Sequence, residues 1–256
     1  MKKSLLVLPL ILFVLIGCAA TRPDTLTQVS TIDALLAGSY DGQMSLRDLL
    51  AHGDMGIGTF NRLDGEMVVL DGQVYQVRVD GKIYSPSPTE TTPFASVVKF
   101  RADARTRAEA GLDFKGLERI VNETAPNQNL FCAVKVTGRF RLVKTRSVPV
   151  QNKPYPPLAE VTANQPVFTL ENVSGTLLGF RSPAYVKGIN VPGYHLHFIS
   201  DDRSSGGHVL ELAIEQGTVE VDTCNRFLMI LPESGGDFAR VDLGRDRSKE
   251  LEKVEK

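Results

Sequence analysis

The chain has 256 residues, of which 42% are hydrophobic and 23% charged, so it is long and apolar enough for one large globular domain or two smaller ones that share a core. Its formal net charge of −1 and the lack of any Lys/Arg-rich run argue against electrostatic binding of nucleic acid. The sequence contains neither a His-Glu-x-x-His helix, which argues against a peptidase, nor a phosphate-cradling glycine loop.

The first 18 residues have the pattern of a targeting segment. Two lysines precede an apolar run that is too short to span a bilayer, which takes about 20 residues. The run ends in Leu-Ile-Gly-Cys at residues 15–18, a string that resembles the lipobox of bacterial lipoproteins, in which the cysteine receives lipid. We therefore expect residues 1–18 to be a lipoprotein-type signal peptide and residues 19–28 a tether.

This pattern predicts an exported protein anchored to a membrane through Cys18, in the periplasm or at the cell surface. A cleaved soluble signal with an incidental cysteine is the alternative. If the leader is not used, the protein is cytoplasmic.

Residues 29–144 are expected to form an N-terminal, β-rich half with few helices. The pairs Asp71-Gly72 and Asp80-Gly81 interrupt stretches of period-two alternation, which indicates a meander of hairpins. Ser45 is a suitable N-cap for a short helix that ends before Gly53. Helices are predicted at residues 29–38, 45–52 and 112–123.

A proline-rich stretch at residues 145–157 marks the expected boundary between the halves. Residues 145–256 would then be a C-terminal, metal-binding half of the same enzyme, and its charged tail is expected to be a solvated helix. Together the two halves predict a β-rich α/β (α+β) fold with two sheet-based parts. Strands are expected in this half at residues 167–170, 175–180, 194–200, 209–215, 218–221 and 227–231.

Cys132 and Cys224 both lie in strand-like stretches. In an exported protein they could form one disulfide, and two buried free thiols are the alternative.

Three of the four histidines lie within residues 193–208. If residues 194–200 form a strand, His195 and His197 are two positions apart and project from the same face, roughly 7 Å apart at the backbone. A polar turn can then return the chain so that His208 lies beside them. Three histidines with an open fourth position are typical of catalytic zinc. The alternative is a half-exposed polar strand face without a metal.

These stretches resemble the alpha-acetolactate decarboxylase family. The resemblance begins near Ser30, extends to the C-terminus and includes Thr-Arg-Ser-Val-Pro at residues 145–149 and the whole block 193–208. It implies a two-part, β-rich homodimer that holds Zn²⁺ through His195, His197 and His208. The matching segments fall in order at residues 30–42, 52–60, 63–66, 91–94, 145–149, 153–155 and 193–208.

The resemblance also implies the other site residues. Glu66 and Arg146 match an active-site glutamate and arginine, Thr59 matches a pocket threonine, and a glutamate of the tail enters the site. We expect that glutamate to be Glu255 rather than Glu252. The lipoprotein-type leader departs from the cytoplasmic location usual in the family.

The reaction implied by the resemblance converts 2-acetolactate, a 2-hydroxy-3-oxo acid, to acetoin and carbon dioxide in acetoin and butanediol biosynthesis. A Lewis acid bound to the ketone and hydroxyl oxygens can stabilise the enediolate that decarboxylation leaves. Arg146 can bind the carboxylate. Glu66, Glu255 or the arginine would protonate the resulting carbon.

Two other classes of protein fit parts of the sequence. His195-x-His197 followed by Asp201 also resembles the metal motif of cupins, and a cupin-like metalloenzyme of other specificity predicts Asp201 as a metal ligand with Glu66 and Arg146 remote. A non-catalytic ligand-binding lipoprotein predicts no turnover of any 2-oxo acid.

Overall fold

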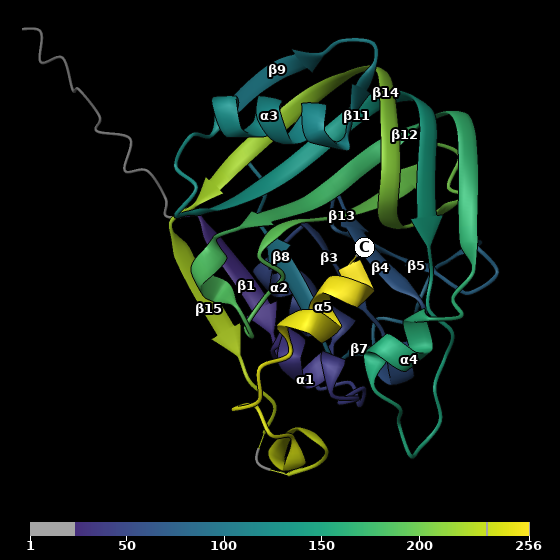
Figure 1. Cartoon of the computed structure of the whole chain (residues 1–256), viewed down its shortest axis with the longest axis vertical. Coiled ribbons are helices and arrows are strands. Elements are labelled where there is room, and N and C mark those ends of the chain that lie inside the picture. Colours follow the sequence, from purple (N-terminus) through teal and green to yellow (C-terminus); the bar gives the residue numbers. More distant parts are fainter. Residues whose placement is uncertain (1–23, 234, 256) are drawn as a thin grey trace, which may run out of the picture.

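The computed structural model describes residues 24–233 and 235–255, so the expected signal peptide and Cys18 lie outside the described residues. The predicted β-rich fold is confirmed: strands dominate this part of the chain, and the helices are few and short (Figure 1). Within the same residues, no helix is both long enough and apolar enough to cross a membrane.

One sheet has seven strands in the order β15-β1-β8-β3-β4-β5-β6. Its neighbours pair antiparallel except β1 and β15, which run parallel although they come from opposite ends of the chain. The predicted Asp71-Gly72 hairpin joins β4 to β5, and both turn residues have positive φ, as a two-residue hairpin turn requires. The strands are β1 Thr25–Val29, β3 Met55–Thr59, β4 Glu66–Leu70, β5 Gln73–Val77, β6 Ile83–Tyr84, β8 Ala95–Val98 and β15 Arg226–Ile230.

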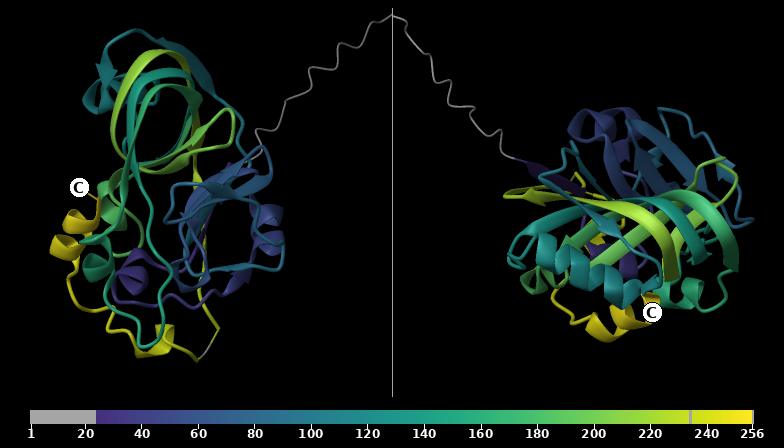
Figure 2. Two further views of the ribbon diagram at one scale, coloured as in Figure 1. Left: turned by 90° about the vertical axis from the view of Figure 1, so that its right-hand side faces the viewer. Right: turned by 90° about the horizontal axis from the view of Figure 1, so that it is seen from above.

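The second sheet has six strands in the order β10-β14-β11-β12-β13, with β9 paired to β14. Because β13 also pairs with β14, four strands close into a ring, and Figure 2 shows the long strands curling around it. Two of the expected strands merge into β12, and two others merge into β14. The strands are β9 Ala104–Ala108, β10 Leu112–Asp113, β11 Phe131–Arg146, β12 Val167–Ser182, β13 Gly193–Ser200 and β14 Gly206–Cys224.

The remaining elements are short. Ser45 caps α2 as predicted, because its side chain accepts a hydrogen bond from the backbone of Asp48. The helix expected at residues 29–38 is confined to α1. The helices are α1 Ile32–Leu36, α2 Leu46–His52, α3 Phe114–Thr124, α4 Leu158–Thr162 and α5 Ser248–Glu255, with 3₁₀ turns at Asn61–Leu63, Ala184–Val186 and Phe238–Arg240 and a small sheet of β2 Met44–Ser45 with β7 Thr91–Thr92.

Apolar side chains fill two main regions around the second sheet. One lies inside the curl and under α3, and the other lies between the two sheets. Cys132 belongs to the first region and Cys224 to the second, and both are buried free thiols. The disulfide alternative is therefore wrong, because the paired strands direct these side chains to opposite faces.

The two sheets do not divide the chain at the expected position between residues 144 and 145. The chain passes from the first sheet to the second between β8 and β9, and β15 returns to the first sheet. Residues 25–28, expected in the tether, belong to β1. Local signals could not show these assignments, because β1 pairs with strands about 70 and about 200 residues further along the chain.

Candidate metal centre

The three predicted histidines meet on the paired strands β13 and β14. His197 lies directly opposite His208, and His195 is two positions before His197 on the same face. One ring nitrogen from each lies within 4.8 Å of the other two. The spacing argument therefore predicted this cluster correctly.

The ring of His197 is held in one orientation. Its Nδ1 donates a 2.8 Å hydrogen bond to the backbone carbonyl of Met67, so Nε2 carries the lone pair. That Nε2 is buried, has no hydrogen-bond partner among the described residues, and lies 3.5 Å from Glu66 Oε2. A neutral imidazole with its other nitrogen anchored to a carbonyl is the usual form of a metal-ligating histidine.

The environment keeps the three imidazoles neutral. Burial, with a smaller contribution from the positive charge of Arg146, lowers the pKa of His195 to about 3. Burial also holds the pKa values of His197 and His208 well below the ordinary value. His208 Nδ1 lies 3.2 Å from His195 Nε2. Three neutral nitrogens that converge in a buried space fit a zinc ion.

Two carboxylates flank the histidines from different parts of the chain. Glu66 begins β4, and Glu255 lies on α5 with its Oε2 3.7 Å from His208 Nε2. Burial raises the pKa of each carboxyl to about 7, although the Arg146 charge acts in the opposite direction. Each group can therefore carry or release a proton near neutral pH.

Arg146 ends β11 opposite His208 in the register. Its Nη1 donates to Gln165 Oε1 at 2.9 Å and its Nη2 to the carbonyl of Val254 at 2.8 Å, while Nη1 lies 3.8 Å from Glu66 Oε1. Its buried Nε has no partner among the described residues. The guanidinium is thus fixed in place at the wall of the site.

His195, His208, Arg146 and the two glutamates line a cavity of about 40 Å³, and His197 lies behind them in the same cluster. The other walls of the cavity are mostly apolar, which keeps the polar groups away from bulk water. Thr59 lines it as expected, with its hydroxyl donating to the carbonyl of Gly65 at 2.7 Å. The lining includes Ile32, Leu35, Thr59, Glu66, Phe94, Arg146, His195, His208, Val254 and Glu255.

Some predicted or considered residues lie elsewhere. Glu255 enters the site, whereas Glu252 is exposed on the same helix, which decides the choice between them. Asp201 is exposed in the turn after β13 and is not part of the histidine cluster. Because Glu66 and Arg146 adjoin the histidines, the cupin-like alternative is wrong on both of its geometric predictions.

Three groups that support the site were not predicted from the sequence. They are the Met67 carbonyl that orients His197, the Gln165 side chain that holds Arg146, and the Val254 carbonyl. Met67 could have been found, since it follows Glu66 directly. No sequence signal marks the other two.

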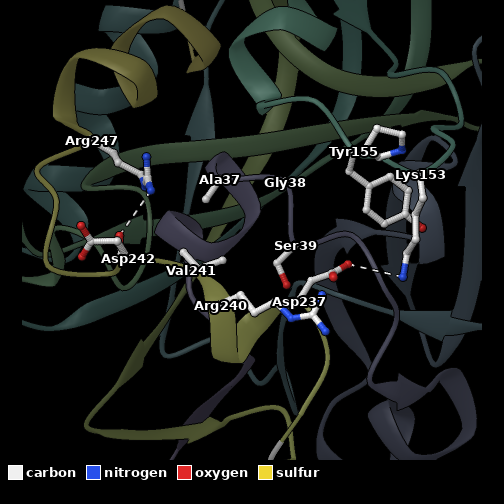
Figure 3. A pocket seen from close by; sticks show the side chains of 11 residues that line it. Ala37, Gly38, Ser39, Lys153, Tyr155, Asp237, Arg240, Val241, Asp242 and Arg247 are labelled. Atoms are coloured by element: carbon white, nitrogen blue, oxygen red, sulfur yellow. Dashed lines mark hydrogen bonds and ion pairs between the residues drawn. The ribbon is translucent and has the colours of Figure 1, made fainter.

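A larger hollow of about 700 Å³ lies near the turn after α1 (Figure 3). Two of its charged side chains already have partners: Lys153 lies 3.5 Å from Asp237, and Arg247 donates to the Asp242 carbonyl at 3.3 Å. It contains no histidine. The histidine cluster and the two carboxyls of raised pKa therefore lie at the smaller cavity rather than in this hollow.

A β-rich scaffold with three convergent histidines, a fixed arginine and two protonatable carboxyls defines a candidate metalloenzyme for a small acid. Residues 26–245 match the sequence model of the family described as alpha-acetolactate decarboxylase. The chain belongs to this family.

Individual relatives agree with this assignment. The alpha-acetolactate decarboxylase of Methanosarcina mazei is 55% identical over 233 residues, which are 91% of this chain and 81% of that protein. The protein of that name from Klebsiella aerogenes is 42% identical over 84% of each chain. The crystal structure of the alpha-acetolactate decarboxylase from Bacillus subtilis strain 168 superposes with a TM-score of 0.87 at 40% identity, covering 90% of this chain and 99% of that one.

Proposed function

We propose that this protein is a zinc-dependent enzyme that decarboxylates 2-acetolactate to acetoin and carbon dioxide. The observation that carries the proposal is a cluster of three neutral histidines, two of which line one small cavity together with Arg146 and two carboxyls of raised pKa. The names of the relatives support the substrate.

A zinc ion held by His195, His197 and His208 would supply a Lewis acid that polarises the ketone of the substrate. Arg146 orients the substrate by binding the carboxylate that departs. Its Nε–H has no partner in residues 24–233 and 235–255, and the contacts to Gln165 and Val254 prevent the guanidinium from following the leaving group.

The bond between the carboxylate carbon and C2 then breaks, and its electron pair delocalises onto the ketone oxygen to give an enediolate. C2 must gain one proton to become the carbinol carbon of acetoin. Glu66 and Glu255 are the available donors, because burial keeps a proton on each up to about neutral pH. Glu66 lies beside His197, whereas Glu255 lies beside His208. The two carboxyls would therefore protonate C2 from different sides of the enediolate.

The direct test follows acetoin and carbon dioxide formed from racemic 2-acetolactate by the purified, zinc-loaded protein. We expect turnover that disappears on removal of zinc and returns when zinc is added. A folded, zinc-loaded protein that releases neither product would refute the activity and favour the ligand-binding alternative.

We also propose that the protein is anchored through Cys18 outside the cytoplasm and acts as a homodimer. The lipobox-like sequence supports the anchor, and the family resemblance supports the dimer. Light scattering of the purified protein, cut free of its lipid, tests the dimer through its mass.

A further inference from the structure

Three aspartates meet at the junction of the two sheets, in a cluster separate from the histidines. Asp24 directly precedes β1, Asp103 lies in the connection from β8 to β9, and Asp222 lies near the end of β14. One carboxylate oxygen from each lies within 4.8 Å of the other two. Three negative groups from distant parts of the chain are thus held together.

The neighbouring donors compensate these carboxylates only in part. The backbone N–H of Arg101 donates to Asp222 Oδ2 at 2.9 Å, and the N–H of Thr223 donates to Asp103 Oδ2 at 2.8 Å. The Arg101 guanidinium lies 3.4 Å from Asp24 Oδ1, but its side chain is 64% exposed. Such an exposed pair contributes little.

Asp222 provides the observation that distinguishes this cluster from an ordinary acidic surface. Its side chain is 0% exposed, and its Oδ1 has no hydrogen-bond partner among the described residues. Burial, together with the negative charges of Asp24 and Asp103, raises the pKa of Asp222 to about 6, although Arg101 acts in the opposite direction. A buried carboxylate with an oxygen that lacks a donor, held beside two other carboxylates, is stabilised by a bound cation when it is ionised.

We propose that Asp24, Asp103 and Asp222 form a second metal site, which binds a calcium ion. All three ligands are hard oxygen donors, which favours Ca²⁺ over the softer metals that nitrogen and sulfur ligands select. Water would complete the coordination at the exposed side, where Asp103 lies.

The ion would join the start of β1 in the first sheet to β14 in the second, through the connection between the sheets. Binding of the ion is therefore expected to stabilise the folded protein. The proposal does not depend on the proposed decarboxylation, since the histidine cluster shares no residue with it.

The test uses the full-length, zinc-loaded protein. Isothermal titration with CaCl₂ should show one calcium per chain, and the melting temperature should rise by about 5–10 °C when calcium reaches 100 times its Kd. Sodium chloride at matched ionic strength should not reproduce the rise. Absence of both heat and shift at 10 mM calcium, about ten times the weakest Kd of extracellular calcium modules, would overturn the proposal.

Variants locate the site. Asp222→Asn should abolish the calcium-dependent shift, and Asp103→Asn, at an exposed position, tests the same site if Asp222→Asn does not fold. Asp71→Asn is the matched control, because its carboxylate is exposed in a hairpin turn whose positive φ asparagine tolerates. His197→Ala should keep the calcium response. A shift that persists in Asp103→Asn and Asp222→Asn would overturn the assignment and indicate an adventitious ion only.

Discussion

Arg146 Nη2 donates a 2.8 Å hydrogen bond to the backbone carbonyl of Val254. This contact ties the end of β11 to α5, where Val254 is buried against the site and the next residue, Glu255, enters the cavity. In Figure 1, α5 lies below β13 of the second sheet, and it contacts α4. The proposed substrate-binding arginine therefore also holds the helix that covers the site.

Glu66→Gln tests the proton donor. The substitution preserves size and can still form hydrogen bonds, but glutamine cannot transfer a proton. We expect zinc content to stay unchanged while turnover falls by about 10² to 10⁴, the usual value of general-acid catalysis. Chiral chromatography of the acetoin gives a second measurement, since one positioned donor yields one enantiomer. Near-normal rate and full stereoselectivity would assign the donor role to Glu255 or Arg146 instead.

His197→Ala tests the metal centre. The loss of one of three ligands should remove zinc and activity together and lower the melting temperature, because the metal binds only the folded state. Zinc per chain is measured by elemental analysis. His52→Ala is the control: His52 lies in the last turn of α2, away from the cluster, and its variant should keep zinc. Full zinc content in His197→Ala would contradict the assignment.

Arg146→Lys tests the positioning of the substrate carboxylate. Lysine keeps the charge but cannot reach both Gln165 and Val254 in the geometry of the guanidinium. Loss of a hydrogen bond to a charged group costs about 1.5–3 kcal/mol, so we expect KM to rise by about 10- to 100-fold. Limited proteolysis should also cleave near α5 faster. An unchanged KM would show that another group binds the carboxylate.

Glu255→Gln tests the raised pKa of the tail carboxyl. The folded, metal-free protein keeps this proton up to about pH 7, whereas the unfolded chain releases it near 4.5. The folded state thus binds more protons between these values, so its stability falls as the pH rises through this window. Relative to Glu255→Gln, wild type should lose up to about 1.4 kcal/mol of unfolding free energy per pH unit in urea titrations. If the unfolding free energies of wild type and Glu255→Gln change with pH in parallel, the pKa of Glu255 is not raised.

Cys18→Ala tests the proposed anchor. Without the acceptor cysteine, the protein should move from the membrane fraction to a soluble one, or remain unprocessed with its leader attached. Cell fractionation and mass spectrometry of the N-terminus distinguish these outcomes. A wild-type protein found in the cytoplasm with Met1 retained would disprove the location.

The metal cluster was predictable from the sequence because its geometry is local. His195 and His197 share a face by the period of a strand, and a short turn returns His208. The roles of Glu66 and Arg146 were accessible only through the family resemblance, because a lone carboxylate beside a turn is common on protein surfaces.

The structure of the charged tail was predicted less accurately from the sequence. Its charge predicted a solvated helix, and α5 does form, but Val254 is buried and Glu255 points into the cavity. Two apolar residues, Leu251 and Val254, among charged ones are too weak a signal to reveal a docking face. The parallel pairing of β1 with β15 was missed for a related reason, since no local pattern specifies a partner about 200 residues away.

The position of β15 and α5 late in the chain has a consequence for biogenesis. As synthesis proceeds from the N-terminus, β1 is made early, yet one of its two partners and the lid of the cavity emerge only after nearly everything else. A nascent polypeptide interrupted before residue 226 would therefore expose an unpaired edge and lack Glu255. Newly made chains should therefore stay inert until Glu255 has been synthesised.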